Sequence, residues 1–286
     1  MAGDILSILI LGLIVSSMYM LIATGFTIIY SVSNILDLSY FGFLMVGAYS
    51  YLLFYEVFPT YICLILAMIT TSILYILMYK VVIRRLIDNP VLVVVMTVLF
   101  NLVLEYILLI VFSRAQRNLF PVIPGVTEIY GTKFHTNMFF VMAASSTVMI
   151  AFWLFIKKTY AGKAILAISM DAKGAKLSGI DPDKNMTIVY AIAGLMAGLS
   201  GISYGAYTAV YPDMFMFPLI IVLAIVLIGG LGSIKGTIIA SGVIGFLEII
   251  TTYWIDPKAR GLSALICIIL ILYIRPQGFF GRKQTL

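Results

Sequence analysis

The sequence predicts an all-α protein, a polytopic bundle of transmembrane helices with about eight or nine membrane segments. Two features of the composition point to this class: 63% of the 286 residues are hydrophobic and only 10% are charged. Soluble domains carry about 25% charged residues, and a soluble core of this size cannot hide so much apolar surface, whereas lipid can solvate it. The third observation is that the apolar residues gather in blocks separated by polar loops. No linker or low-complexity tract divides residues 1–286, so a single transmembrane domain is expected.

The apolar blocks give the expected positions of the helices. A helix needs about 20 residues to cross the hydrocarbon layer of a membrane. The second, seventh and ninth blocks are short, so any of them is expected to be either a non-ideal crossing or a re-entrant segment. In chain order the nine blocks are Ile5–Tyr30, Leu38–Tyr55, Tyr61–Tyr79, Val91–Phe112, Asn137–Ile156, Met186–Tyr207, Phe215–Leu231, Gly236–Ile255 and Gly261–Ile274.

Basic residues between the blocks predict the orientation. They concentrate after the third, fifth and ninth blocks, and the positive-inside rule places these three loops in the cytoplasm. Nine crossings then put the N-terminus outside and the C-terminus inside, whereas one re-entrant block would move the N-terminus inside. The residues concerned are Lys80, Arg84, Arg85, Lys157, Lys158, Lys163, Lys173, Lys176, Lys184, Arg275, Arg282 and Lys283.

The net charge of +6 therefore concerns the lipid bilayer rather than nucleic acid, because the positive charges lie in loops where they orient helices and contact anionic lipid. The segment 113–136 also carries basic residues. Its Pro121, Pro124 and Gly125 predict an ordered external cap rather than a helix.

Local signals mark helix ends and close packing. Asp181-Pro182 and Asn89-Pro90 each fit a helix N-cap followed by proline in the first turn. In the sixth block, Gly194, Gly198 and Gly201 recur three or four residues apart on one helical face, where they let two backbones approach closely. Such a face serves either plain helix packing or a moving interface. The glycines between residues 229 and 236 predict a tight turn or an unwound segment.

Two carboxylates lie well inside apolar blocks. Placing a charge at the centre of a membrane helix costs about 2.5–3.5 kcal/mol on insertion scales, so Glu105 and Glu248 are expected to face protein or water. Each serves either structural hydrogen bonding or the lining of a solute path. Asp37, at the entry of the second block, is expected to cap a helix N-terminus.

Enzyme signatures are missing from the sequence. The single histidine, His135, lies in the external segment, and Cys63 and Cys267 lie inside apolar blocks. No catalytic or metal-ligating motif is present, so no metal site is expected. The run from Gly232 to Gly236 lacks the order and spacing of a P-loop, so this chain is not expected to bind ATP in that way.

The loop of residues 157–185 is long, basic and helical in pattern. Residues 160–179 contain few helix breakers, and Lys163, Lys173 and Lys176 decorate this stretch. An apolar stripe recurs every three or four residues on one face, which is typical of a short amphipathic helix. Such a helix either lies on the membrane surface or docks in a groove of another protein. The stripe consists of Ile165, Ile168, Ala172 and Ala175.

Four stretches carry a likeness to a known family. They are Gly25–Tyr30 followed by Phe43–Tyr49, then Ala161–Ala164 through Leu177–Ile180, then Leu227–Ser233 with Gly236 and Gly245–Glu248, and finally Arg275–Gly281. Together, in this order, they make the chain resemble the permease subunits of the branched-chain amino-acid type ABC importers. The likeness covers nearly the whole chain.

This resemblance implies a function and a set of partners. It implies a transport subunit, not an enzyme, working with two cytoplasmic ATP-binding cassette subunits, a second homologous or identical permease and an external solute-binding protein. This chain would bind no cofactor, and ATP would be used by the partner subunits. The resemblance also favours ATPase coupling for the loop helix. The implied ATPase-contact residues are Lys163, Ala164, Ile168, Ala172, Lys173, Lys176 and Gly179.

The solute is expected to be small and polar, with a branched-chain or other amino acid as the first expectation. Candidate residues for the solute path are Asp37, Ser39, Tyr40, Glu105 and Glu248. Where the family usually has an Asn-Phe-Ala-His-Gly-Glu run, this chain has residues 37–42, and Ile221 stands in place of a common lysine. Relatives also carry urea and short amides, which keeps these solutes open. Three further functions stay open: a proton- or ion-coupled secondary transporter, an intramembrane enzyme and a membrane scaffold.

Overall fold

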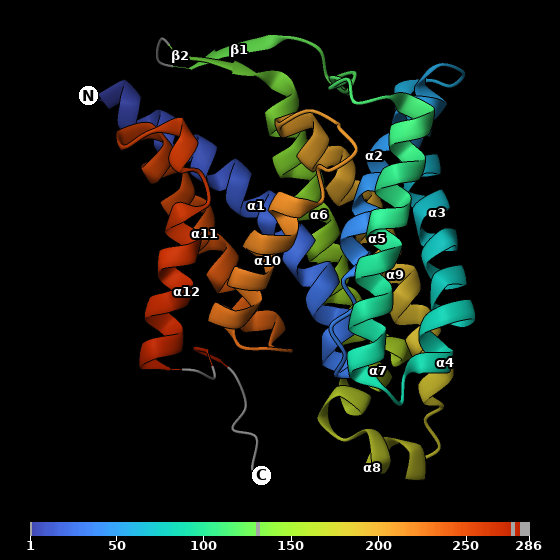
Figure 1. The fold of residues 1–286 in the computed structure, drawn as a ribbon. Coiled ribbons are helices and arrows are strands. Elements are labelled where there is room, and N and C mark those ends of the chain that lie inside the picture. Colours follow the sequence, from blue (N-terminus) through green and yellow to red (C-terminus); the bar gives the residue numbers. More distant parts are fainter. Residues whose placement is uncertain (1, 130–131, 276–277, 281–286) are drawn as a thin grey trace.

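The computed structural model describes residues 2–129, 132–275 and 278–280, and these residues form a bundle of helices (Figure 1). The long helices run side by side between two ends of the molecule. A β-hairpin lies at one end and two short helices lie at the other. Of the residues named so far, those outside the described part are Pro276, Gln277, Gly281, Arg282 and Lys283.

All nine expected blocks form helices. The structure differs from a purely helical fold by one small antiparallel sheet, β1–β2. The elements in chain order are α1 (Ala2–Ser33), α2 (Ser39–Tyr55), α3 (Thr60–Met78), the π-helical turn η1 (Tyr79–Ile83), α4 (Arg84–Leu86), α5 (Pro90–Phe112), β1 (Val126–Ile129), β2 (Thr132–His135), α6 (Thr136–Lys158), α7 (Tyr160–Met170), α8 (Ala172–Leu177), α9 (Pro182–Tyr207), α10 (Met216–Gly229), α11 (Ile234–Trp254), the 3-10 turn η2 (Pro257–Ala259) and α12 (Leu262–Ile274).

Length separates the helices into two groups. In the described part of the chain, six helices are long and apolar enough to cross a membrane: α1, α3 with its extension to Leu86, α5, α6, α9 and α11. Helices α2, α10 and α12 have 17, 14 and 13 residues. At 1.5 Å per residue they reach only about 20–25 Å, which is less than the hydrocarbon thickness of about 30 Å.

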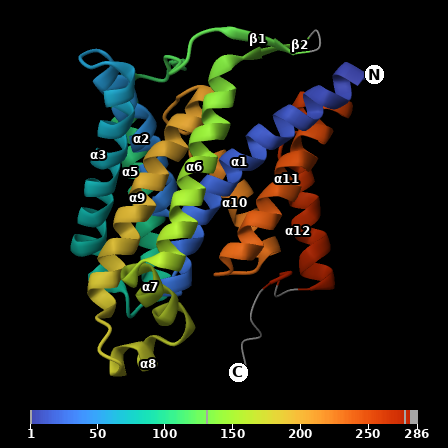
Figure 2. The same cartoon turned by 180° about the vertical axis from the view of Figure 1, so that it is seen from behind.

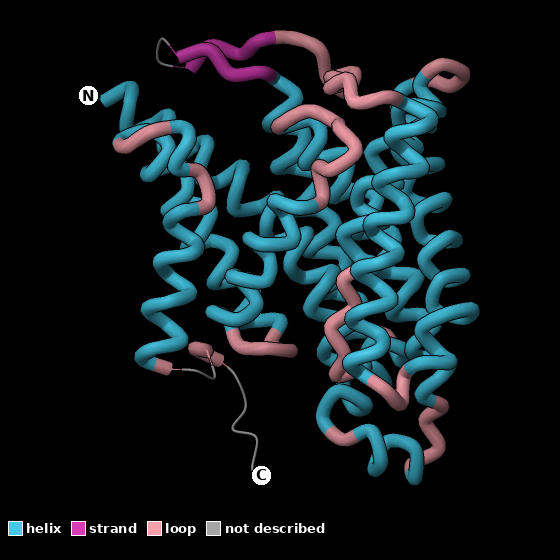
Figure 3. Tube along the Cα trace, in the orientation of Figure 1, coloured by secondary structure: helices cyan, strands magenta, loops and turns pink. Residues whose placement is uncertain are grey.

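Two of the short helices follow non-helical breaks inside the bundle. Residues 34–38 separate α1 from α2, and residues 208–215 separate α9 from α10. Figure 3 shows both breaks as loop within the helical bundle, so α2 and α10 begin part-way along it. Asn34 has a positive φ of 54°, which ends α1. Pro212 has no backbone N–H to donate, which suits the second break.

The core is built where α1 and α9 cross the middle of the bundle. Helix α1 packs along α11 and α9, and α9 packs along α3 and α2. In Figure 1 the near side carries α5, α10 and α12, whereas Figure 2 brings α6, α9 and α1 to the front. The predicted glycine face of α9 lies in these contacts, with Gly194 against Ser72 of α3 and Gly201 against Leu44 of α2.

Helix α9 also begins where the sequence predicts. The Asp181 side chain accepts hydrogen bonds from the backbone N–H groups of Asp183 and Lys184, and Pro182 is the first helical residue. The glycines after α10 make a tight turn, because Gly230 and Gly232 both take positive φ values of 95° and 78°. In the segment 113–136, Arg117 pairs with Val210 and joins this segment to the second break.

Replacing Gly201 with alanine is expected to destabilise the protein by about 1–3 kcal/mol. A Cβ at this position would overlap the carbonyl oxygen of Leu44, so α2 and α9 would have to separate. Gly242→Ala in α11 is the matched control, because a Cβ there meets nothing within 4 Å. The control should be neutral or slightly stabilising, since alanine favours helix. Thermal unfolding of the purified variants measures both effects, and equal melting temperatures would contradict the close packing of α2 on α9.

Candidate functional site

The basic loop folds into two short helices, which lie at the end of the bundle opposite the β-hairpin (Figure 1). The sequence pattern predicts one helix over residues 160–179. The structure instead breaks it at Asp171, whose side chain accepts a hydrogen bond from the backbone N–H of Lys173 at 3.0 Å and so caps α8. An aspartate inside a helix competes for backbone donors, which is why the break falls here.

The apolar stripe of this loop faces the bundle rather than a partner. Ile165, Ile168 and Ala175 are buried, and α7 packs against α6, α9 and α1. Ile168 is one of the implied ATPase contacts, but its side chain is only 4% exposed and points into the bundle. The fourth residue of the stripe, Ala172, is exposed because the chain turns at Asp171. The amphipathic pattern is confirmed, but its apolar face anchors the helices to their own protein.

The opposite face of the loop is open. Lys163, Lys173, Lys176 and Gly179 are exposed there, and Ala164 is partly buried. Three large apolar side chains share this surface: Leu166, Met170 and Leu177, the last of them 90% exposed. Sequence reasoning missed these three, because none belongs to the regular stripe. We call the exposed residues Lys163, Leu166, Met170, Ala172, Lys173, Lys176, Leu177 and Gly179 the exposed α7–α8 face.

Asp37 lies in the first break and is 1% exposed. Its Oδ1 accepts hydrogen bonds from the backbone N–H (3.0 Å) and the hydroxyl of Ser39, and its Oδ2 accepts one from the Tyr75 hydroxyl at 2.9 Å. The N-cap position itself is Leu38, so the expected capping residue is displaced by one position. The carboxylate still binds the first N–H of α2, which is the positive end of that helix.

Tyr40 lies close to this carboxylate in sequence but points to another neighbour. It is fully buried, and its hydroxyl lies where a Cβ on Gly25 would be, so only glycine at position 25 leaves room for it. Helix α5 holds the same break from the other side. Asn101 donates a hydrogen bond to the carbonyl of Leu38 at 2.8 Å, and Thr97 accepts one from the Leu38 N–H at 3.3 Å.

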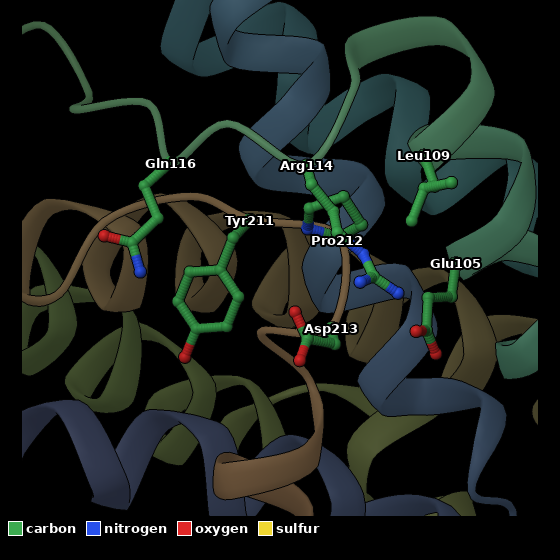
Figure 4. Close-up of a pocket in the computed structure, with 7 residues that line it drawn as sticks. All are labelled: Glu105, Leu109, Arg114, Gln116, Tyr211, Pro212 and Asp213. Carbon is green, nitrogen blue, oxygen red and sulfur yellow. The ribbon is translucent and has the colours of Figure 1, made fainter.

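Glu105 lies one turn beyond Asn101, but the two side chains have different surroundings. Asn101 is buried against the break, whereas Glu105 lines an open cavity of about 420 Å³. Figure 4 shows the Arg114 guanidinium extending toward the Glu105 carboxylate, with Asp213 beside them on the wall of this cavity. Asp213 comes from the second break, so the cavity joins α5 to residues 211–213. The other residues that line it are Leu109, Gln116, Tyr211 and Pro212.

Glu248 is 1% exposed and is not among the residues that line this cavity. Its Oε2 accepts a hydrogen bond from the Tyr19 hydroxyl at 2.7 Å, and its Oε1 accepts one from Arg260 Nε at 2.7 Å. These two contacts join α11 to α1 and to the turn before α12. The contacts of Glu248 and Arg260 are those of a structural ion pair that holds three segments together. This ion pair is separate from the Asp37 cluster and from the cavity.

Arg260 is the counter-ion that sequence reasoning missed. Its guanidinium also lies over two aromatic rings, 5.0 Å from the centroid of Tyr207 and 4.7 Å from that of Phe217. Burial lowers the pKa of Arg260, but the neighbouring Tyr19 and Glu248 oxygens outweigh this effect, and the pKa lies above its ordinary value. The signal available in the sequence was a lone arginine in a short turn between two apolar blocks.

The chain is similar to known proteins over nearly its whole length. The family model described as "Branched-chain amino acid transport system / permease component" matches residues 8–274. The high-affinity branched-chain amino acid transport system permease protein LivH of Escherichia coli K12 is 24% identical and covers 96% of this chain and 94% of its own length. BraD of Pseudomonas aeruginosa, described in the same words, is 22% identical over 97% of this chain and 96% of its own.

A solved structure supports the fold. PsaBC from Streptococcus pneumoniae, in complex with a Fab, matches 97% of this chain and 93% of its own with a TM-score of 0.51 and 16% sequence identity. At that identity the likeness concerns the fold alone. The helices described above, the full-length relatives and the family match together identify a multi-pass inner-membrane protein and an ABC transporter permease. The chain therefore belongs to the family of branched-chain amino acid transport system permease components.

Proposed function

We propose that this chain is the membrane-spanning subunit of an ATP-driven importer and that it moves a small polar solute, first of all a branched-chain or other amino acid. The observation that carries the proposal is the exposed α7–α8 face, where large apolar side chains and lysines lie in the open. We interpret it as a cytoplasmic coupling face for the ATPase. Exposed apolar side chains of this kind mark a surface that a partner covers. The family match and the names of the full-length relatives support the solute class.

The partners follow from this role. Two ATP-binding cassette subunits contact the coupling face from the cytoplasm, and a second homologous or identical permease completes the pathway. A solute-binding protein delivers the solute on the outer side. This chain binds no cofactor and hydrolyses no ATP itself. In this proposal the N-terminus lies outside and the C-terminus in the cytoplasm, which places α7 and α8 on the ATPase side.

The solute path in this proposal runs along the two breaks. Half-length helices with unwound backbone are the usual places where transporters hold a solute, because broken helices leave polar groups inside the membrane. Asp37, Ser39 and Tyr40 lie at the first break, and Glu105 lines the same cavity as Asp213 of the second break. Glu248 takes no part in the path, because Tyr19 and Arg260 occupy its carboxylate.

Reversing the charge of the coupling face is expected to separate the subunits. In the double variant Lys173→Glu/Lys176→Glu, and separately in Leu177→Glu, co-purification of the ATPase subunits and ATP-driven uptake should fall about tenfold, a loss of roughly 1.4 kcal/mol. Lys133→Glu, on the hairpin at the opposite end, is the control and should leave both unchanged. Unaltered co-purification and uptake in the coupling-face variants would contradict ATPase docking on α7 and α8.

The activity itself is tested by reconstitution. The permease pair, candidate ATPase subunits and the solute-binding protein are placed in lipid vesicles, and a panel of amino acids, urea and short amides is screened. ATP-stimulated uptake of an amino acid is the expected result. If only urea or an amide is taken up, the proposed solute is wrong but the ATP-driven import mechanism stands. Uptake by this chain without ATPase subunits would overturn the proposal.

A further inference from the structure

The coupling loop ends at a latch centred on Asp183, the second residue of α9. Asp183 Oδ1 accepts a hydrogen bond from the Tyr79 hydroxyl at 3.0 Å, and its Oδ2 pairs with Arg84 Nη2 at 2.9 Å. Tyr79 opens the π-helical turn η1 and Arg84 opens α4. One carboxylate therefore ties the exit of the coupling loop to the end of α3.

Three buried aromatic rings lead inward from this latch, and we call Tyr79, Tyr190 and Tyr75 the tyrosine ladder. Tyr79 stacks on Tyr190 of α9, with ring centroids 4.5 Å apart and an interplanar angle of 20°. Tyr190 meets Tyr75 of α3 edge-on, at 5.0 Å and 82°. Each ring is at most 2% exposed. Stacked and edge-to-face pairs are the geometries that aromatic rings favour, so the three positions are mutually constrained.

The inner end of the ladder reaches the first break. The Tyr75 hydroxyl donates its hydrogen bond to Asp37 Oδ2, and Asp37 Oδ1 accepts from the Ser39 N–H at the start of α2. The contacts therefore run without a gap from the coupling loop to the half-length helix. The hydroxyl of the middle ring, Tyr190, also interacts with Asp37, whereas Asp183 contacts the ladder through Tyr79.

The ladder cannot deform smoothly. Tyr75 of α3 and Tyr79 of η1 are four residues apart, and Asp183 and Tyr190 are seven apart on α9, so each pair lies near one helical face. Tyr190 contacts both of the other rings. A rotation or axial shift of the first turns of α9 must break either the stack or the latch, and packed interfaces of this kind switch between discrete arrangements. The π-helical turn beside the latch is a feature that recurs at functional sites.

We propose that the tyrosine ladder transmits movement of α7 and α8 to the break at Asp37, so that Tyr79 and Tyr190 are positioning residues for transport. This inference rests on the proposed function, because an ATPase must displace the coupling loop. With the latch closed, Tyr75 holds Asp37 and the start of α2. Displacement of Asp183 frees Tyr79, unstacks Tyr190 and lets Tyr75 leave Asp37, which changes the break where the proposed path runs.

The decisive measurement is the number of solute molecules taken up per ATP hydrolysed, measured on the complete complex in lipid vesicles. Tyr190→Leu removes the central ring and is expected to lower this ratio about tenfold while hydrolysis continues. Tyr190→Phe keeps the ring and loses only the hydroxyl that interacts with Asp37, which Tyr75 and Ser39 still hold, so the ratio should return to within about twofold of the original protein. A residue that only packs the core would lower stability, hydrolysis and uptake together and leave the ratio unchanged.

Two further variants protect the test. Asp183→Asn changes a half-exposed side chain at the latch, so the complex should still assemble, and a drop of about threefold or more in the ratio is expected. Tyr51→Leu is the matched control, because Tyr51 is also a buried tyrosine but bonds the Phe120 carbonyl outside the ladder. Its ratio should stay unchanged. If the Tyr190→Leu complex fails to assemble, the solute-to-ATP ratio of the Asp183→Asn complex is sufficient to test the ladder.

An unchanged ratio in Asp183→Asn, with or without an assembled Tyr190→Leu complex, overturns the ladder. That failure is distinct from failure of the proposed function. If the unmodified complex shows no ATP-driven uptake, the importer proposal fails and takes the ladder with it. If the unmodified complex transports and Asp183→Asn keeps its ratio, only the ladder is wrong.

Discussion

Replacing Arg260 with methionine is expected to destabilise the protein by about 2–4 kcal/mol, because it leaves Glu248 buried without a counter-charge. Glu248 is 1% exposed, whereas the Arg260 side chain is 26% exposed, so the loss lies below that of a fully buried pair. The methionine side chain fills much of the space that Arg260 occupies between Tyr207 and Phe217, so little of the stability loss comes from a cavity. Unfolding of the purified chain in lipid nanodiscs measures the change.

Two companion variants separate charge from packing. In Glu248→Gln/Arg260→Met both charges are removed and the amide oxygen still accepts from Tyr19, so most of the lost stability should return. Arg260→Lys keeps the charge but loses the planar contacts with two rings and should be intermediate. If the double variant is no more stable than Arg260→Met, the unpaired carboxylate is not the cause of the loss.

Replacing Asp37 with alanine is expected to cost about 3 kcal/mol and to abolish uptake by the assembled complex. The substitution leaves the Tyr75 hydroxyl and the Ser39 N–H buried without their acceptor, and it removes the anion at the start of α2. Because α2 begins inside the bundle, water does not replace the lost partner as it would at a surface. Thermal unfolding and uptake on the same preparation measure the two effects.

Tyr75→Phe is the matched control for this prediction. It removes one donor and keeps both the ring and the carboxylate, so it should cost only about 1 kcal/mol. The stability loss in Asp37→Asn should lie between those of Asp37→Ala and Tyr75→Phe. The asparagine oxygen can still accept a hydrogen bond, but its NH2 group faces a donor that the carboxylate would have bound. A stability of Asp37→Ala equal to that of the unmodified protein would show that the first break does not depend on this carboxylate.

Much of the fold could be predicted from the sequence, because lipid imposes simple rules on length and polarity. Every apolar block became a helix, and the second, seventh and ninth blocks, noted as short, are the helices α2, α10 and α12. The N-cap at Asp181 and the tight turn near Gly230 followed from local chemistry that does not depend on distant residues. These features are encoded within a few neighbouring positions.

The site was less accessible from sequence because its contacts join distant segments. Arg260 and Tyr19 meet Glu248 from different elements, and no pattern in the sequence pairs them. Ile168 belongs to a correct amphipathic stripe, but periodicity does not say whether the covering surface is the same chain or a partner. The roles of Tyr75 and Tyr190 depend on the register between α3 and α9, which only packing determines.

The short length of α10 has a consequence for biogenesis. With 14 residues, it is too short to be recognised as a complete crossing when it leaves the ribosome. Gly229 and Gly236 lie in direct backbone contact across the turn that follows, so α10 and α11 can enter the bilayer together as a helical hairpin. Co-translational insertion of α10 is therefore expected to wait until α11 has been synthesised.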